Sequence, residues 1–539
     1  MRRSLAVHHG SLPPLPPVLT ADAMREADRF TIEEYGVPGF TLMESAGRGA
    51  ADRIAAAYGP LADQPAMILC GKGNNGGDGL VVARQLLAYG AEVHVVTMDP
   101  PDALRGDPAR NYALLEQLRA SERDRLTLRV FDGLDALDAY AQRVRPALYV
   151  DALLGTGLTS ALREPIRGVV SWLNDRPAPV VAIDVPTGLH SDTGAVLGDA
   201  VVADRTVTMA ALKAGLLLGE GPRVAGALDV IEIGIPRFAL DRAAEAPGCA
   251  RLTTDAGVRR WLPTRAHDAY KYSVGMALVV GGAPGYTGAP VMAAQAAARA
   301  GAGYVACACP SAVQPILAGK LTEIPTIALP DGEAGIRPDA ALQALDDTLP
   351  RARALLVGPG LGRAPDTARF VQALLRQSDR PAVVDADGLN ALAGQMNAFA
   401  PHAAGRWILT PHAGEFRRLA GSDADLEDRL RTAQAYAERW NCVLLLKGMP
   451  SVVACPDGTA YVNGTGNPAL ATAGTGDVLA GFCTGFLAQG LTPKHAALCA
   501  LHVGGAAADR YAARVHARTT VALDLLDQLP SVLDERFAV

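Results

Sequence analysis

The chain has 539 residues, more than one ordinary hydrophobic core accommodates, so we expect at least two domains. Hydrophobic residues make up 49% and charged residues 20%, a composition typical of globular proteins rather than of disordered chains. The net charge is -6, and no basic stretch is long enough to predict a nucleic-acid surface. These numbers favour an enzyme or binding protein for small ligands.

The first residues carry two arginines but lack the apolar stretch of a secretory signal peptide. No apolar run approaches the roughly 20 residues that a membrane-spanning helix needs. The eight cysteines are scattered without zinc spacing or a disulfide pattern, which favours small buried thiols in a reducing compartment. We therefore expect a cytoplasmic protein with no membrane partner.

Short aliphatic stretches recur along the chain, and each is followed by a glycine-rich turn and an Ala/Leu-rich helical stretch. This alternation predicts βαβ units with parallel sheets. The strands of a first series are predicted at 66–70, 92–97, 147–151, 179–184 and 228–233. The strands of a second series are predicted at 276–280, 303–309, 353–357, 381–385 and 442–446.

Between the two series, residues 237–258 show little strand pattern and are rich in Ala and Arg. We place a domain boundary at about residue 245, with one domain over 1–245 and another over 246–539. Two doubly wound α/β domains in tandem are the simplest architecture. Because ligands of such sheets bind at the carboxyl ends of the strands, the turns after the strands are the candidate sites.

The first such turn has the sequence GKGNNGGDG, from Gly71 to Gly79, and opens a helix predicted from about Leu80 to Tyr89. Its glycines let the backbone approach a ligand closely and allow positive φ angles. The free amides at the start of the following helix suit a phosphate group. Asn74, Asn75 and Asp78 add polar groups that a merely structural turn rarely needs.

Two further strands of this series end in an aspartate that is followed by a Gly/Thr-containing loop. Asp151 precedes ALLGTGL, and Asp184 precedes VPTGL. Each aspartate alone could be a turn residue or a helix cap. Three neighbouring loops of the same design favour one shared site.

The motifs GxGNNGGDGL, DALxGTGL and IDVPTGL together resemble the epimerase domain of the NAD(P)H-hydrate repair enzymes, over roughly residues 20–240. The resemblance implies a potassium ion bound by Asn75, Asp151 and Thr187, whose oxygens suit a hard cation. It implies that Asp184 contacts the substrate, as the candidate general acid or base at the carbon that inverts. The hydrate-binding residues that it implies are Asn74, Asn75, Gly76, Gly77, Asp78, Gly155, Thr156, Gly157, Leu158, Thr159, Ser160 and Ala161.

In the second series, the segment NPALATAGTGD (467–477) precedes a helix predicted over 478–490. Its glycines leave amides free at the start of that helix, where they can stabilise charge that develops during phosphoryl transfer. Asp477 could accept the proton of a hydroxyl group that is being phosphorylated, and a plain helix cap is the alternative interpretation.

Other loops of this series also follow strands. TPHAGEF contains His412, either a ligand contact or a buried core histidine, and KGMPS contains Lys447, either a phosphate ligand or a solvated surface lysine. The loops at 281–288, 358–362 and 385–390 complete the set.

The AGTGD segment resembles the ribokinase-like superfamily, in which the aspartate is the catalytic base. With GPGLG, DADGLNAL, TPHAGEF and KG in this order, the chain resembles the NAD(P)H-hydrate dehydratase branch over roughly residues 255–530. The resemblance implies that Gly362, His412 and Asp477 contact the hydrate. The nucleotide-binding residues that it implies are Lys447, Gly448, Met449, Pro450, Ser451, Gly474, Thr475 and Gly476.

Together the resemblances imply a Rossmann-like N-terminal domain and a ribokinase-like C-terminal domain that repair hydrated nicotinamide cofactors. The first domain would epimerise R- and S-NAD(P)H-hydrate with K⁺, and the second would dehydrate the S form with ADP (or ATP) and Mg²⁺. A homo-oligomer is expected. Two alternatives stay open: a small-molecule kinase with a nucleotide-binding module, and a non-catalytic N-terminal binding or scaffolding module.

Overall fold

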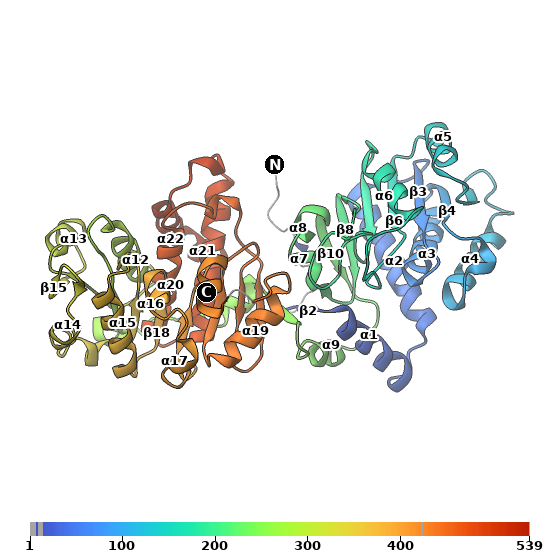
Figure 1. Ribbon diagram of the computed structural model, residues 1–539. Helices are drawn as coiled ribbons and strands as arrows, with labels where there is room; N and C mark the ends of the chain where they lie inside the picture. Colours follow the sequence, from blue (N-terminus) through green and yellow to red (C-terminus); the bar gives the residue numbers. More distant parts are fainter. Residues whose placement is uncertain (1–6, 9–14, 422–423, 538–539) are drawn as a thin grey trace. The chain divides into compact units, whose positions relative to one another are not determined.

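The computed structural model describes residues 7–8, 15–421 and 424–537. The chain divides into two compact units, one up to Ala250 and one from Arg251. Each unit has a sheet of mainly parallel strands with helices around it (Figure 1), which confirms the predicted fold class of two doubly wound α/β domains. None of the helices in the described part of the chain is long and apolar enough to cross a membrane.

The sheet of the N-terminal unit is parallel throughout. The chain runs outward from β3 to β5, then returns to the other side of β3 and runs outward to β10. This reversal leaves a crevice beyond the carboxyl ends of β3 and β6, where doubly wound sheets bind ligands. In spatial order the strands are β1 (Val7–His8), β10 (Ala227–Ile231), β8 (Arg205–Met209), β7 (Val180–Ile183), β6 (Leu148–Ala152), β3 (Pro65–Cys70), β4 (Glu92–Thr97) and β5 (Leu126–Val130).

Helices cover both faces of this sheet, because alternate side chains of each strand point to opposite faces. Ile68 belongs to the core under α2, α3 and α4, whereas Met67 and Leu69 belong to the core under α5 and α6. These helices are α2 (Gly39–Tyr58), α3 (Asn74–Ala88), α4 (Gly106–Leu118), α5 (Leu134–Val144) and α6 (Ile166–Asn174). The rest of the unit includes β2 (Pro17–Leu19), α1 (Ala21–Arg29), β9 (Leu212–Lys213), α7 (Ala214–Leu217), α8 (Gly221–Val224) and α9 (Arg237–Ala243).

The sheet of the C-terminal unit reverses in the same way, here between β12 and β17. Its strands are parallel except β21, which runs antiparallel to both of its neighbours. In spatial order they are β14 (Thr326–Leu329), β13 (Tyr304–Pro310), β12 (Met276–Val280), β17 (Ala354–Val357), β18 (Ala382–Val384), β19 (Trp407–Leu409), β20 (Val443–Leu446), β21 (Val452–Ala454), β22 (Ala460–Asn463) and β11 (Ala250–Thr253).

Helices α12, α20, α21 and α22 pack against one another in this unit, and α20 also lies against β12, β17 and β18. The loops that follow β12, β17 and β18 therefore lie near α20. The main helices are α12 (Gly288–Arg299), α13 (Gln314–Lys320), α14 (Pro338–Ala344), α15 (Pro365–Gln377), α16 (Asp387–Ala391), α17 (Met396–Ala403), α18 (Ala413–Ala420), α19 (Arg429–Arg439), α20 (Thr475–Ala488), α21 (Pro493–Ala512) and α22 (Ala522–Phe537).

The predicted start of the first glycine-rich helix was wrong, because α3 begins at Asn74 instead of Leu80. The predicted positive φ angles were also wrong: none of the glycines from Gly71 to Gly79 has one. These glycines serve close packing instead. A Cβ at Gly76 would lie 1.8 Å from the carbonyl oxygen of Gly71, and one at Gly79 would lie 2.5 Å from the Cβ of Ala152.

The helix after the AGTGD segment also begins earlier than predicted, at Thr475. Its N-cap is Gly474, whose φ angle of 93° is in the left-handed region that glycine adopts without strain. Asp477 consequently lies inside the first helical turn. The interpretation of Asp477 as a plain helix cap is therefore wrong.

We predict that Gly76→Ala destabilises the N-terminal unit by about 2–3 kcal/mol, because the new methyl group overlaps backbone that has no room to move. Gly73→Ala is the matched control, since a Cβ there meets nothing within 4 Å. Calorimetric thermal unfolding of the two variants measures the difference. Equal transition temperatures would contradict the packing role of Gly76.

Candidate functional sites

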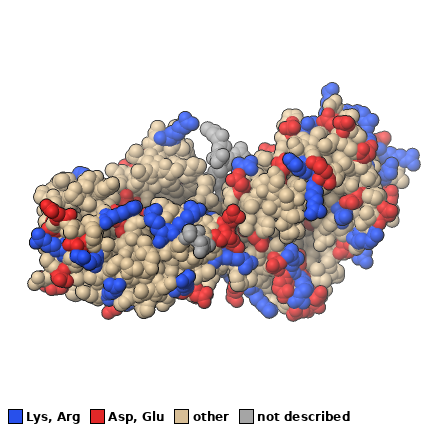
Figure 2. Space-filling model, viewed as in Figure 1, with Lys and Arg blue, Asp and Glu red and all other residues tan. Residues whose placement is uncertain are grey.

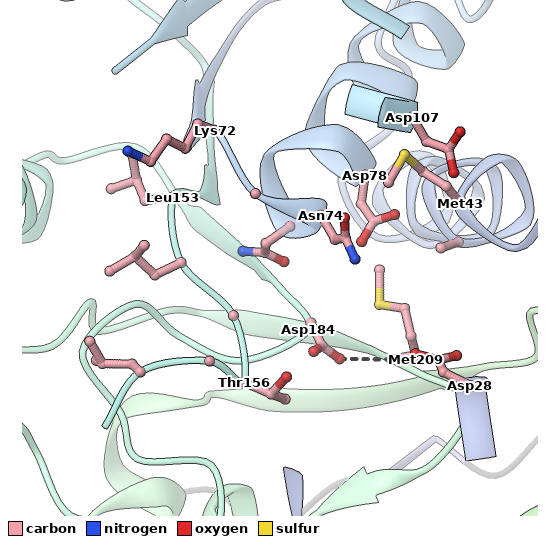
Figure 3. A pocket seen from close by; sticks show the side chains of 18 of the residues that line it. Asp28, Met43, Lys72, Asn74, Asp78, Asp107, Leu153, Thr156, Asp184 and Met209 are labelled. Atoms are coloured by element: carbon pink, nitrogen blue, oxygen red, sulfur yellow. Dashed lines mark hydrogen bonds between the residues drawn. The ribbon is translucent and has the colours of Figure 1, made fainter. Parts of the chain in front are cut away.

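The N-terminal crevice contains a cavity of about 790 Å³ beyond β3 and β6. Two of the predicted loops line it directly: Asn74, Asn75 and Asp78 come from the start of α3, and residues 155–158 come from the loop after β6. Asp184, just after β7, also projects into it (Figure 3). The structure thus brings together the side chains that the sequence placed on three separate loops.

Not every predicted binding residue reaches this cavity. Gly76 and Gly77 are buried within α3, where they allow the helix to pack closely. Thr159, Ser160 and Ala161 are exposed and are not among the residues that line the cavity.

Asp151 and Thr187 form a buried hydrogen-bonded pair beside the cavity. The hydroxyl of Thr187 donates to Oδ1 of Asp151 at 2.7 Å, and its amide donates to Oδ2 at 2.8 Å. Burial raises the pKa of Asp151 to about 6, against the opposing effect of these hydrogen bonds. Nearby, the side-chain oxygen and nitrogen of Asn75 are buried without a hydrogen-bond partner in the described structure.

The cavity also contains charged residues that the sequence motifs did not identify. Asp28 comes from α1, and Lys213 comes from β9. Lys213 is 1% exposed and lies 2.5 Å from Asp184. The lysine could have been suspected because it is the one charged residue in the apolar stretch TMAALKAGLLLG (208–219). Asp28 gives no such signal, since its surroundings in the sequence are already polar.

In the C-terminal unit, Lys447 follows β20 and lies at the beginning of α20. Its ammonium group is 2.9 Å from Asp385 and 3.9 Å from Glu415. A Cβ at Gly476 would be 3.4 Å from the same nitrogen. Burial opposes its charge, but the carboxylates of Asp385 and Glu415 raise the pKa of Lys447 overall. The interpretation of Lys447 as a solvated surface lysine is therefore wrong.

Asp477 faces this ion pair from the first turn of α20. Burial, followed by the negative charge of Asp385, raises the pKa of Asp477 to about 7, while Lys447 acts in the opposite direction. A carboxyl group with a pKa near neutrality can exchange a proton readily at physiological pH. Asp477 therefore has the properties of a general base.

His412 is the N-cap of α18, and its Nδ1 accepts from the amides of Gly414 and Glu415. Its side chain is 56% exposed, so the core-histidine interpretation is wrong. The amide of Gly362 donates to Asp387, and Asp387 and Glu415 both act on the charge of Asp477. The loops after β17, β18, β19 and β20 consequently meet around the start of α20.

Within the described part of the chain, no group of three or more His, Cys, Asp or Glu side chains is arranged to hold a metal ion. On the face shown in Figure 2, acidic and basic side chains are interspersed, and large areas carry no charge. The sites described above offer buried carboxyl groups, backbone amides and, in each unit, one lysine paired with an aspartate.

Comparison with known proteins gives two family matches. The model described as YjeF-related protein N-terminus matches residues 39–215. The model described as NAD(P)H-hydrate dehydratase matches residues 277–531.

Curated relatives match along nearly the whole chain. The bifunctional NAD(P)H-hydrate repair enzyme of Salinibacter ruber is 63% identical over 97% of this chain and 97% of its own length. The enzyme of the same description from Moorella thermoacetica is 43% identical over 96% of both chains. A solved ADP/ATP-dependent NAD(P)H-hydrate dehydratase from Bacillus subtilis is 31% identical, with a TM-score of 0.44 over 53% of this chain and 98% of its own. The chain belongs to the family of bifunctional NAD(P)H-hydrate repair enzymes.

Proposed function

We propose that the N-terminal unit interconverts the R and S forms of hydrated NADH and NADPH. The C-terminal unit then dehydrates the S form to NAD(P)H and consumes ADP, or ATP in its place. Membership of the family across nearly the full chain carries this proposal. The structure supports it, since Asp184 lines the N-terminal cavity and Asp477, with a pKa raised to about 7, lies at the start of α20 in the C-terminal unit.

In the epimerase unit, the loop residues Asn74, Asp78 and 155–158 surround the hydrate. The amides at the start of α3 face the phosphate groups of the dinucleotide, because the helix dipole favours negative charge there. Asp184 acts as a general acid or base for the reaction at the carbon that inverts.

The donor set of Asn75, Asp151 and Thr187 fits a potassium ion. It offers amide, carboxylate and hydroxyl oxygens, and a buried amide oxygen without a partner is a group that a cation would satisfy. A single carboxylate suits a monovalent ion better than a divalent one. When bound, K⁺ would neutralise the charge of Asp151 and fasten the three loops to one another.

In the dehydratase unit, Asp477 removes the proton of the ring hydroxyl while that oxygen receives a phosphoryl group. Amides at the start of α20 stabilise the transferring group. The carbon–oxygen bond then breaks, and the phosphate leaves with its electron pair. The neighbouring carbon loses a proton, so that the ring double bond forms again. Gly362 and His412 hold the hydrate, and residues 447–451 with 474–476 hold the adenine nucleotide.

The charge of this site indicates how the phosphates are bound. Asp385, Glu415 and Asp387 all act on the charge of Asp477 here, while Lys447 provides the opposing positive charge. Phosphate groups entering alone would be repelled, so we propose that Mg²⁺ enters with the nucleotide, held by its phosphates and one or two carboxylates. A cytoplasmic location and a homo-oligomeric state stay predictions.

The test of both activities uses a racemic mixture of hydrated NADH with ADP or ATP, Mg²⁺ and K⁺. We expect the near-ultraviolet absorbance of the reduced nicotinamide to recover to nearly the full hydrate concentration. Recovery to about half would mean dehydration without epimerisation, and would favour a binding module in the N-terminal unit. No recovery, with a stable phosphorylated product, would favour the small-molecule kinase.

We predict that Asp477→Ala reduces dehydration about 10²–10⁴-fold, because the hydroxyl loses its general base, and leaves epimerisation unchanged. In the wild type, the dehydration rate should fall below about pH 7, where Asp477 takes up its proton. Asp366→Ala is the matched control, because Asp366 also lies in the first turn of a helix but is paired with Arg369 at the surface. Loss of epimerisation in a folded Asp477→Ala protein would contradict separate sites.

Potassium should raise the unfolding temperature of the N-terminal unit relative to tetramethylammonium at equal ionic strength, since a ligand of the folded state stabilises it. The shift should disappear in Asn75→Leu, which removes a proposed ligand. Gln142→Leu should keep it, because Gln142 lies on α5 and bonds to Asp138 at the surface of the same unit. An equal shift in all three proteins would exclude the proposed site.

A further inference from the structure

The ammonium group of Lys213 is held by three hydrogen bonds in the epimerase cavity. Its ammonium group donates to Asp184 at 2.5 Å, to the hydroxyl of Thr208 at 3.1 Å and to the carbonyl oxygen of Met209 at 2.8 Å. These contacts use all three of its donors. A lysine in this state has no donor left for a substrate phosphate, so its positive charge acts on Asp184.

Asp184 is fixed through one of its two oxygens. Its Oδ1 accepts from Lys213, from the hydroxyl of Thr208 and from the amide of Met209. No described residue donates to Oδ2, which leaves that oxygen for the cavity. The backbone of Asp184 has a φ angle of 65°, a conformation that costs energy outside glycine and is often found at functional sites.

Two other carboxyl groups share the cavity, Asp78 on α3 and Asp28 on α1 (Figure 3). No hydrogen bond reaches the Asp78 carboxyl group from the described residues. Burial, then the charges of Asp184 and Asp28, raise the pKa of Asp78 well above its ordinary value. Burial also raises the pKa of Asp28, to about 6, with Lys213 opposing and Asp184 adding to the rise. The three carboxyl groups near Lys213 therefore differ: Asp184 is paired with the lysine, whereas Asp78 and Asp28 have raised pKa values.

The remaining charged side chains that line the cavity are Arg25, Lys72, Asp99 and Asp107. Lys72 and Asp99 form an exposed pair at 3.9 Å, and Asp107 pairs with Arg110. None of these four makes a hydrogen bond or ion pair with Asp78 or Asp184 within the described structure. Among the charged side chains that line the cavity, Lys213 is therefore the one that contacts Asp184.

Inversion of the hydrate requires one acid and one base. Water adds to a dihydronicotinamide at the carbon bonded to the ring nitrogen, so the nitrogen lone pair can expel the hydroxyl group. The carbon–oxygen bond breaks, a carbon–nitrogen double bond forms, and the leaving oxygen takes a proton to become water. Water then adds to the opposite face and gives up a proton. No electrons are exchanged with any other reactant.

We propose, on the basis of the epimerase function above, that Asp78 donates the first proton, Asp184 accepts the second, and Lys213 positions Asp184 as the acceptor. Asp184 keeps Oδ2 unbonded to any described residue, and the ammonium group of Lys213 holds its Oδ1. Asp78 projects from α3 just beyond its first turn, without a partner that would hold it as an anion. The proton returns from Asp184 to Asp78 through water, and the reverse reaction uses the same two groups with their roles exchanged.

The test follows the conversion of the purified R form in the absence of nucleotide, so that the dehydratase stays silent. Lys213→Met should reduce kcat/KM for epimerisation at neutral pH at least about 10-fold, and should move the acid limb of its pH profile upward by about one unit or more. Raising the pH should then restore part of the activity. A purely structural lysine would lower activity without moving the limb.

Arg205→Met is the matched control, because Arg205 forms a buried ion pair with Asp229 in the same sheet but touches no cavity residue named here. It should lose stability and keep the wild-type pH profile. Asp78→Asn provides a second variant with little risk to folding, since Asp78 has no hydrogen bond to lose. It should reduce epimerisation about 10²-fold or more.

The outcomes separate this inference from the proposed function. Wild-type protein that fails to convert the R form would overturn the epimerase function itself. Wild-type conversion combined with an unmoved acid limb in Lys213→Met, or with near-wild-type activity in Asp78→Asn, would overturn the acid–base assignment alone.

Discussion

Each unit of the protein contains a lysine–aspartate ion pair at the carboxyl ends of its strands, and the chemistry of each site depends on that pair. Lys213 pairs with Asp184 in the N-terminal unit, and Lys447 pairs with Asp385 in the C-terminal unit. Burying a charge is unfavourable unless an opposite charge and hydrogen bonds compensate, so each pair fixes where its charge lies. Because the lysine of each site is already paired with one aspartate, it compensates the negative charge of the other carboxyl groups nearby less completely.

The same arrangement raises the proton affinity of one further aspartate in each unit. Asp78 lies near the start of α3 and Asp477 in the first turn of α20, and for both the first cause of the raised pKa is burial. A neighbouring carboxylate adds to the shift in each case, and the lysine opposes it. Two unrelated reactions, inversion and dehydration, can therefore use a common principle: an aspartate whose pKa is raised by burial, beside one that is held by a cation.

Close packing of backbone makes this placement possible. In α3 the absence of side chains at Gly76 and Gly79 lets the helix lie against the ends of β3 and β6, so that Asn75 lies beside Gly155 in the loop after β6. Glycine lowers intrinsic helix propensity, which is why the sequence pattern predicted a helix only from Leu80. Tertiary packing overrode that preference, and six residues predicted to form a loop joined the helix.

The sequence by itself determined the two α/β units, many of their strands and the loops that carry Asp151, Asp184, His412, Lys447 and Asp477. It could do so because apolar strands, glycine-rich turns and motif spacing are local features of the chain. Only the tertiary structure decided the electrostatics of the sites. Lys213 and Asp28 lie outside every recognised motif, and the raised pKa of Asp78 arises from burial and from Asp184, more than 100 residues further along the chain. Proton affinity depends on which charges meet in space and on how much water remains around them, and neither quantity is local in sequence.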